Sequence, residues 1–408
     1  MIKILQNLLG WIDARFPLSK MWNEHLAQYY APKNFNFWYF FGSLALVVLI
    51  NQIVTGIWLT MSYKPDAELA FGSVEYIMRD VPWGWLIRYM HAVGASAFFV
   101  VIYLHMFRGL MYGSYKHPRE LLWMSGMFIF LCLMAEAFLG YLLPWGQMSY
   151  WGAKVIISLF GAIPVIGETL VLWIAGDYVI SDVTLNRFFS FHVIAVPVAL
   201  LGLVVLHVLA LHEVGSNNPD GIEIKKNKDK NGIPLDGIPF HPYYSVKDIV
   251  GVIVFLIFFA LVIFFAPDMN GYFIEHNNFI PANPMVTPEH IAPVWYFTPF
   301  YAILRAVPDK LFGVLAMGIG VMVLFLLPWL DRNPVKSIRY RGTLYKWILG
   351  IFVFSFFALG WLGMQAPTPF LTWMSRLFTA LYFAFFIFMP VYSTMDKTKP
   401  VPERVTYK

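Results

Sequence analysis

Residues 85–111 read WLIRYMHAVGASAFFVVIYLHMFRGLM, an apolar stretch long enough to cross a lipid bilayer as one helix. Two histidines interrupt the stretch, His91 and His105, and they lie 14 residues apart. On an α-helix this spacing corresponds to about 21 Å of rise and returns to within roughly 40° of the starting face, so both side chains share one stripe near opposite leaflets. An ionisable residue inside a membrane is costly, and the pair therefore indicates a functional role.

The composition places the whole chain in a membrane. Of its 408 residues, 59% are hydrophobic and only 13% are charged, whereas a typical soluble domain has about 25% charged residues. Much of the apolar surface must therefore face lipid, which excludes a soluble enzyme and a nucleic-acid-binding module. The single cysteine, Cys132, excludes internal disulfides, a thiolate-ligated iron–sulfur cluster and covalent c-type haem attachment.

The apolar stretches predict an all-α polytopic membrane protein with eight transmembrane helices, the first four of which form a four-helix bundle. We expect two parts, residues 1–215 with this bundle and residues 216–408 with the remaining helices and two long connectors. The predicted spans are 37–62, 83–111, 121–143, 185–212, 247–266, 311–330, 345–363 and 373–393.

The charges of the connectors predict the orientation. Lysine and arginine are concentrated after the second and sixth spans and in the C-terminal tail, whereas acidic residues dominate the connectors after the first, third and fifth spans. The positive-inside rule then places both termini in the cytoplasm of a bacterium, with the protein in the inner membrane. Residues 1–33 are interpreted as an amphipathic lead-in and not as a signal peptide. The apolar segments 147–159, 165–175 and 293–304 are too short to span and predict helices at the outer surface.

A second pair of histidines, His192 and His207, lies on the span 185–212. This span runs parallel to 83–111, so His91 is expected to face His192 near the outer side and His105 to face His207 near the inner side. Two facing imidazoles at each of two depths suit two planar metal macrocycles, namely b-type haems held non-covalently by bis-histidine ligation. A proton relay is the competing interpretation.

Small and basic residues flank the histidines. Each of the two other bundle helices carries a pair of glycines 14 residues apart, which would permit close backbone approach at each haem level, although ordinary helix packing also uses such residues. Arg88 and Arg108 lie three residues from a histidine and are candidates for pairing with haem propionates, with snorkelling as the alternative. His192 and His207 are 15 residues apart, roughly 60° off one face, which still allows both to serve as ligands. Because Pro197 lies between them, we expect a local bulge or kink to absorb the residue beyond 14. The glycines are Gly42, Gly56, Gly126 and Gly140.

Several segments occur in an order that resembles the cytochrome b family, the haem- and quinone-binding subunit of the quinol–cytochrome c oxidoreductase (bc1) complex, in its bacterial form. Because one chain holds all eight spans, it resembles the bc1 form and not the divided b6f form. The matching segments are 85–94 (WLIRYMHAVG), 140–152 (GYLLPWGQMSYWG), 187–192 (RFFSFH), 212–219 (HEVGSNNP), 240–248 (FHPYYSVKD) and 295–308.

The resemblance implies an enzyme subunit that oxidises ubiquinol near the outer face, reduces ubiquinone near the inner face and contributes to proton translocation. It also implies a Rieske iron–sulfur protein, cytochrome c1 and membrane lipid as partners, and a homodimer of the complex. The outer quinol site would comprise Tyr141, Met148, Gly152, Pro293 and Tyr296, with Tyr301 directed toward the Rieske protein. The inner quinone site would comprise His212, Ser216, Lys247 and Asp248.

The inner assignments also have a chemical basis, because a histidine and a carboxylate at the cytoplasmic boundary can supply protons to a reduced quinone. Asp248 has an alternative interpretation as an acidic residue in the first turn of its helix. Two alternative functions remain for the whole chain. One is a membrane anchor subunit with two haems in another respiratory enzyme, and the other is a secondary transporter.

One position departs from the family pattern. The family's outer-site motif is Pro-Glu-Trp-Tyr, in which the glutamate accepts a proton from quinol, but this chain has Val294 at that position. Valine cannot accept a proton. Our hypothesis is that Glu289, in the preceding segment Thr-Pro-Glu-His, takes that role, with His290 as another candidate relay and a solvated loop acid as the alternative.

Overall fold

The computed structural model describes residues 2–23 and 29–407. Eight helices in this part of the chain are long and apolar enough to cross a membrane, which confirms the predicted number. They are α3 (Phe40–Thr60, extended at its start by the 3-10 turn Phe37–Tyr39), α5 (Gly84–Tyr112), α6 (Glu120–Leu142), the continuous span Asp182–Val214, α11 (Tyr243–Phe265), the span Lys310–Leu330, α15 (Thr343–Met364) and α16 (Pro369–Ile387).

The last span differs most from its predicted range, 373–393. Thr368 caps α16 by accepting a hydrogen bond from the Leu371 backbone at 3.2 Å, and Pro369 occupies the first helical turn, where a missing N–H costs nothing. At the other end, the segment after Ile387 forms a separate helix, α17 (Met389–Met395).

The span Asp182–Val214 contains three segments: α9 (Asp182–Ser190), a π-helical turn (Phe191–Ala195) and α10 (Val196–Val214). A π turn accommodates one extra residue, and Pro197 removes one backbone donor just after it. His192 lies in the π turn. The predicted local bulge between His192 and His207 is thus confirmed.

Several shorter helices connect the spans. The predicted surface segments 147–159 and 165–175 form α7 (Gln147–Phe160) and α8 (Gly167–Ala175), and 293–304 forms a 3-10 turn (Trp295–Phe297) followed by α12 (Thr298–Ala306). A further helix, α4 (Ala70–Arg79), was not predicted. Other short 3-10 turns are Ile224–Lys226 and His276–Phe279.

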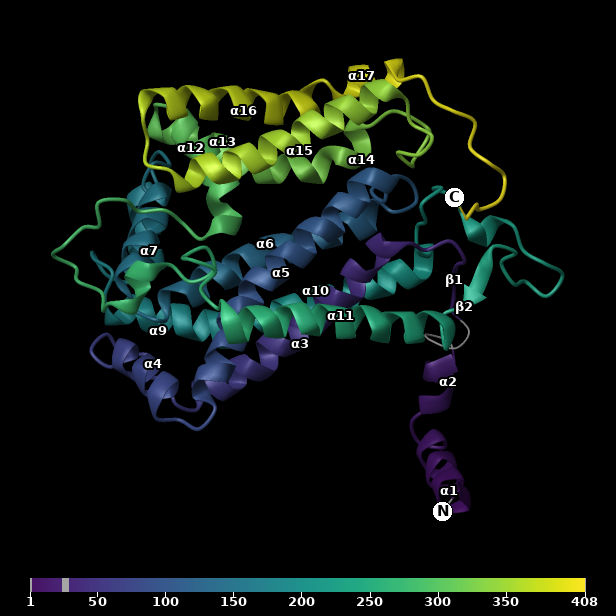
Figure 1. Ribbon diagram of the computed structural model, residues 1–408, viewed down its shortest axis with the longest axis horizontal. Helices are drawn as coiled ribbons and strands as arrows, with labels where there is room; N and C mark the ends of the chain where they lie inside the picture. The colour runs from purple at the N-terminus through teal and green to yellow at the C-terminus, as the bar shows by residue number, and fades with distance from the viewer. Residues whose placement is uncertain (1, 24–28, 408) are drawn as a thin grey trace.

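The structure also contains a small antiparallel ladder, in which β1 (Tyr30–Pro32) pairs with β2 (Gly237–Pro239). It joins the segment before the first span to the connector before α11, so the chain is not entirely helical. Residues 1 and 24–28 of the predicted lead-in 1–33 lie outside the described residues. Its helices α1 (Ile2–Asp13) and α2 (Leu18–Trp22) extend away from the bundle in Figure 1.

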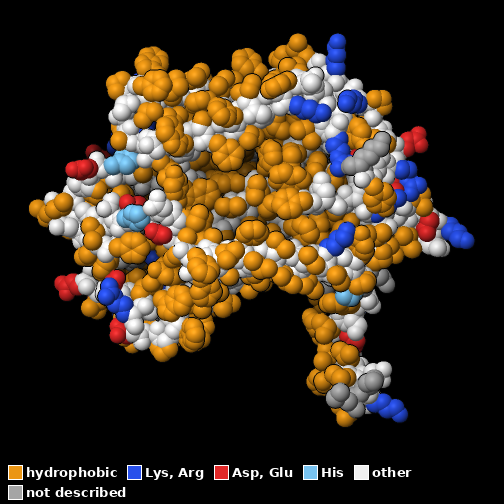
Figure 2. Space-filling view, in the orientation of Figure 1, with side chains coloured by type: hydrophobic (Ala, Val, Ile, Leu, Met, Phe, Trp, Pro, Cys, Tyr) orange, Lys and Arg blue, Asp and Glu red, His pale blue; other side chains and the backbone are white. Residues whose placement is uncertain are grey.

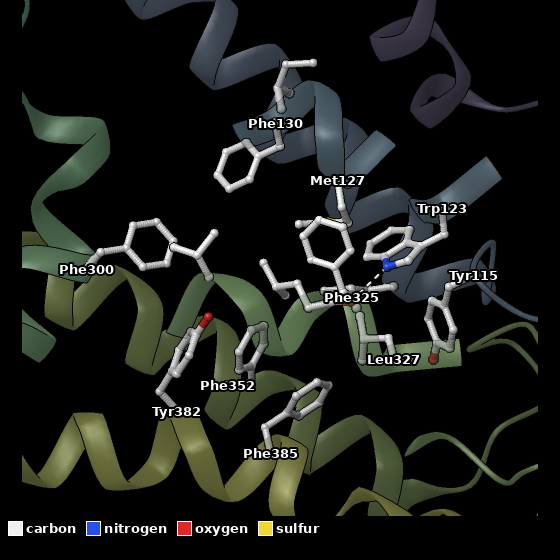
Figure 3. Close-up of a cluster of buried hydrophobic side chains, with 14 of the residues drawn as sticks. Tyr115, Trp123, Met127, Phe130, Phe300, Phe325, Leu327, Phe352, Tyr382 and Phe385 are labelled. Carbon is white, nitrogen blue, oxygen red and sulfur yellow. Dashed lines mark hydrogen bonds between the residues drawn. The ribbon is translucent and has the colours of Figure 1, made fainter. Parts of the chain in front are cut away.

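Within the bundle, α3 packs against α5 and α10 packs against α6, while α15 contacts both α12 and α16. The largest core cluster joins the two halves of the chain: Trp123 on α6 donates a hydrogen bond to the Leu324 carbonyl at 2.8 Å, among aromatic side chains from α12, α15 and α16 (Figure 3). Figure 2 shows apolar side chains across the middle of the molecule and most of the visible Lys and Arg side chains at the end near the C-terminus. This distribution is that of a multi-pass membrane protein.

Candidate functional site

The structure brings the four span histidines together as two pairs. The ring centroids of His91 and His192 are 6.2 Å apart, and those of His105 and His207 are 6.4 Å apart. We call His91 and His192 the outer pair and His105 and His207 the inner pair, after their expected depths. Each pair joins α5 to the span Asp182–Val214.

The separations fit a metal held between two rings. A metal–imidazole bond measures about 2 Å, and two such bonds in line, with the radius of each ring added, require about 6 Å between centroids. When their nitrogens point at each other, two rings at this distance are too far apart for a direct hydrogen bond. The gap between the nitrogens suits a metal ion. The donor set, two neutral imidazoles in an apolar bundle, is one that haem iron accepts.

Hydroxyl groups orient two of the rings through Nδ1. Thr55 Oγ1 lies 2.9 Å from His91 Nδ1 and donates its own hydrogen to the Asn51 carbonyl at 2.6 Å. Ser125 Oγ has the same relation to His207 Nδ1, at 2.9 Å, and donates to the Leu122 carbonyl at 2.9 Å. Because each hydroxyl oxygen must therefore accept from the ring, Nδ1 carries the proton and Nε2 is left as the free metal ligand.

The other two rings differ from this pattern. His192 Nδ1 donates to the backbone carbonyl of Glu136 at 3.0 Å, and the Glu136 carboxylate Oε1 lies 2.9 Å from the same nitrogen. His105 Nδ1 is buried and has no hydrogen-bond partner among the described residues. The outer pair thus includes a carboxylate neighbour that the inner pair lacks.

Each predicted glycine lies against one of the four histidines. A Cβ atom built on Gly42, Gly56 or Gly126 would lie 3.5, 3.3 or 3.2 Å from Cε1 of His105, His91 or His207, respectively. Gly140 is the tightest of the four, since a Cβ there would lie 2.9 Å from both ring nitrogens of His192. The glycines therefore occupy the levels of the histidine pairs, two on α3 and two on α6.

Gly140→Ala should displace the His192 ring, because the three atoms nearest to the added methyl group all belong to that ring. If each pair holds a b-type haem, the variant should reduce or lose the haem of the outer pair and retain that of the inner pair. A reduced-minus-oxidised spectrum of membranes that contain the variant measures this loss. Gly202→Ala is the matched control, since Gly202 lies on α10 and a Cβ there meets nothing within 4 Å. An unchanged outer haem in Gly140→Ala would show that the ring can move without cost.

The two predicted propionate partners lie at the expected levels of α5. Arg88 is one turn before His91, and Arg108 is three residues after His105. Arg108 donates a hydrogen bond to the Asn217 carbonyl at 3.2 Å, which ties the inner end of α5 to the segment after α10.

At the outer end, a cavity contains three of the predicted quinol-site residues, Tyr141, Gly152 and Pro293. Val294 also lines it, so the residue that departs from the family motif faces this space. The remaining lining residues are apolar or aromatic: Phe138, Ile156 and Phe297.

The other three predicted outer residues do not line this cavity. Met148 is buried in α7. The Tyr296 ring stacks on Phe99 with centroids 3.9 Å apart, and Tyr301 donates a hydrogen bond to the Ile291 carbonyl at 3.3 Å. Their positions are those of groups that hold the loop in place beside the cavity.

Backbone and side-chain hydrogen bonds fasten the connector before α12 onto the start of α7. The Gln147 backbone donates to the Ile280 carbonyl at 3.0 Å, and Asn278 Oδ1 accepts from the Ser149 backbone at 2.8 Å. Gln147 Oε1 accepts from the Asn283 backbone at 2.7 Å. Gly146 permits this approach, because a Cβ there would lie 2.6 Å from the Asn278 side chain. The outer cavity therefore lies where α6, α7 and the connector before α12 meet.

The two glutamates of this connector, Glu275 and Glu289, occupy different environments. Glu289 is exposed. Glu275 is half-buried and lies close enough to Tyr141 for the two groups to interact electrostatically. Burial raises the pKa of Glu275 above its ordinary 4.5, although hydrogen bonds from Asn277 oppose the shift. Among the described residues, the buried Tyr141 hydroxyl has no hydrogen-bond partner of regular geometry, and the Asn278 side chain lies near it.

At the inner end, Tyr29 connects two predicted quinone-site residues. Its ring lies against that of His212, with centroids 4.5 Å apart, and its hydroxyl shares a hydrogen bond with Ser216 Oγ at 2.8 Å. Burial raises the pKa of Tyr29, while the hydrogen bonds with Ser216 act in the opposite direction. The phenol therefore stays protonated at neutral pH.

Asp248 and Lys247 lie at the start of α11 and have partners of their own. Asp248 Oδ1 accepts a hydrogen bond from Ser43 on α3 at 2.9 Å. Lys247 donates to the Tyr243 hydroxyl at 2.8 Å and lies over that ring, 4.3 Å from its centroid. Asp248 thus faces the bundle. An acidic residue that only stabilised the first turn of its helix would not need this contact with α3.

Some of these groups were missed from the sequence. Glu136 is an acidic residue inside a predicted span. An ionisable residue in a membrane is costly and indicates a function, but the sequence prediction used this criterion only for the histidines. Tyr29, Thr55 and Ser125 had no comparable signal, since hydroxyl side chains are common in and around membrane helices.

The chain matches known proteins over most of its length. The family model described as cytochrome b/b6/petB matches residues 26–215, and that described as cytochrome b(C-terminal)/b6/petD matches residues 281–383. Cytochrome b of Allochromatium vinosum is 66% identical over 406 residues, covering 98% of both chains. Cytochrome b of Rhodospirillum rubrum is 51% identical, covering 98% of this chain and 96% of that protein.

The solved structure of a hyperthermophilic respiratory Complex III contains a chain that matches with a TM-score of 0.88 and 41% identity, covering 95% of this chain and 99% of that one. The likeness in sequence and in fold extends through both halves of the molecule, and the chain therefore belongs to the cytochrome b family.

Proposed function

We propose that this chain is the haem- and quinone-binding subunit of a ubiquinol–cytochrome c oxidoreductase of the bc1 type. The observation that carries the proposal is the pairing of four span histidines at two depths, with a glycine against each ring. A redox subunit of a membrane complex is the function that the family and the Complex III likeness support.

Membership of the family implies b-type haem. We infer two such haems, one held by the outer pair and one by the inner pair, with Nε2 of each histidine as the ligand atom. A bound b-type haem supplies one-electron transfer. The protein's part is to fix the rings through Thr55, Ser125 and Glu136 and to leave space through the four glycines.

The outer quinol site is inferred at the cavity between α7 and the connector before α12. Tyr141 is the polar side chain that lines it, and Val294 leaves no proton acceptor at the motif position. Glu289 is the replacement predicted from the sequence. Its exposed position, set against the half-buried position of Glu275 within electrostatic range of Tyr141, favours Glu275.

The inner quinone site is inferred around His212, Ser216 and Asp248, with Tyr29 as an additional member. Tyr29 holds Ser216 and covers one face of His212, so it orders this side of the site. Asp248 and Lys247, at the first turns of α11, supply a carboxylate and an ammonium group nearby in the membrane's inner interface. Proton delivery to a reduced quinone is the role that their chemistry supports.

The proposed surroundings follow from the same function. The basic residues gathered near the C-terminus in Figure 2 support cytoplasmic termini in a bacterial inner membrane. A Rieske iron–sulfur protein and cytochrome c1 would approach the opposite, outer end, and two copies of the complex would form a homodimer. Residues 1–215 would carry the haems, and residues 216–408 would complete both quinone sites.

A reduced-minus-oxidised spectrum of the purified complex tests this function, combined with inhibition by analogues of quinol that act at the outer site. We expect two b-type haem components and quinol-dependent reduction that the analogues block. Two haems without such inhibition would favour an anchor subunit of another respiratory enzyme. The absence of any b-type haem signal would overturn the proposal in favour of a transporter.

A further inference from the structure

Glu136 is a carboxylate inside the span Glu120–Leu142, at the level of the outer histidine pair. Its Oε1 lies 2.9 Å from His192 Nδ1, and its Oε2 is buried without a hydrogen-bond partner among the described residues. A carboxylate in the apolar part of a membrane protein is costly and needs a compensating interaction. The imidazole of His192 is the compensating group that the geometry provides.

The four histidines differ in what their Nδ1 atoms meet. A neutral hydroxyl meets His91 and another meets His207, while His105 Nδ1 has no partner in the described part of the chain. Only His192 of these four has a carboxylate beside Nδ1. The two proposed haem levels are therefore electrostatically unequal through the protein alone.

The physical effect of this inequality has a definite sign. A carboxylate that accepts a hydrogen bond from Nδ1–H increases the electron density on the ring and makes it a stronger electron donor through Nε2. Its negative charge also stabilises the ferric over the ferrous state, because the ferric state carries one more positive charge and the surroundings are of low dielectric constant. Both effects lower the reduction potential.

We propose that Glu136 is a positioning residue that fixes His192 and holds the reduction potential of the outer haem below that of the inner haem. The inference rests on the proposed function, which places a haem at each pair. An electron delivered at the outer level then moves to the inner level with a favourable change in free energy. Glu136 would thus set the direction of transfer across the membrane.

The test is a redox titration of Glu136→Gln in the assembled complex in membranes, followed by the absorbance of each haem. Glutamine keeps a hydrogen-bond acceptor of the same length and removes the charge. We expect the ferric-to-ferrous ratio of the outer haem at a fixed ambient potential to fall at least tenfold, an upward shift of about 59 mV for a one-electron couple. The inner haem should not shift.

Two matched variants separate charge from fit. Glu136→Asp keeps the charge and should give a smaller shift, and Ser125→Ala removes the hydroxyl beside His207 and should affect the inner haem alone. If Glu136→Gln cannot retain the outer haem, Glu136→Asp should still retain it, and loss from both variants would contradict the role of the charge.

The inference would be overturned if the reduction potential of the outer haem were unchanged in Glu136→Gln, or if the potentials of both haems shifted equally. The proposed function would still stand, because it depends on the haems of the wild-type complex. The electron paramagnetic resonance signal of the ferric outer haem gives a second readout, because altered ligation by His192 moves its g values. Failure of the proposed function is distinguishable, since the wild-type complex would then show no haem pair to titrate.

Discussion

His105→Leu should remove the inner b-type haem and leave the outer haem in place. Leucine fills a similar volume but has no nitrogen to bind iron, and His207 alone cannot provide two axial ligands. His207→Leu should produce the same spectrum, because these two rings face each other at 6.4 Å. His91→Leu and His192→Leu should remove the other haem. Redox titration of the remaining signal identifies which haem each variant has lost.

The pairing by depth makes this test discriminating. If His105→Leu and His91→Leu removed the same haem, the proposed ligand pairs would be wrong even though haem is bound. His117→Leu is the control, since the side chain of His117 is 88% exposed and lies outside the spans. It should retain both haems. Loss of quinone reduction at the inner face should accompany loss of the inner haem.

Glu275→Gln should slow quinol oxidation by about 100-fold or more, the usual effect of removing a general base, while both haems remain. The carboxylate must be deprotonated to accept a proton, so activity should fall as the pH decreases through its pKa. Burial raises that pKa above 4.5, so the loss of wild-type activity on acidification, the acid limb of the pH–rate profile, should be centred above this pH. The limb should disappear in the glutamine variant, as measured by quinol-dependent turnover across pH.

Glu289→Gln is the matched control for this prediction, because both residues belong to the same connector and Glu289 is exposed. A modest effect of Glu289→Gln with a large effect of Glu275→Gln would assign the proton acceptor to Glu275. The reverse result would restore the hypothesis based on sequence alone. Full activity in both variants would exclude both glutamates of this connector as the proton acceptor.

The sequence was sufficient for the features that depend on periodicity and composition. Eight apolar stretches predicted eight spans, and the spacing of His91 and His105 placed two side chains on one face of a helix. These inferences need only the rise and turn of a helix and the thickness of a bilayer. The 15-residue spacing and Pro197 also predicted a bulge or kink, and the structure has a π turn at Phe191–Ala195.

The sequence was insufficient where the site depends on contacts between distant connectors. The approach of Glu275 to Tyr141 requires the connector before α12 to fold back onto the start of α7, and no local pattern predicts that path. Tyr29 reaches Ser216 from 187 residues away. Such neighbours are fixed by tertiary packing, which a single sequence does not display.

The π turn at Phe191–Ala195 determines where the second pair of histidine rings points. One additional residue in a regular helix rotates everything beyond it by about 100°, which would turn His207 away from His105. The wider turn absorbs such a residue locally, and the later part of the helix keeps its facing. The 15-residue interval from His192 to His207 can therefore match the 14-residue interval from His91 to His105, ring opposite ring.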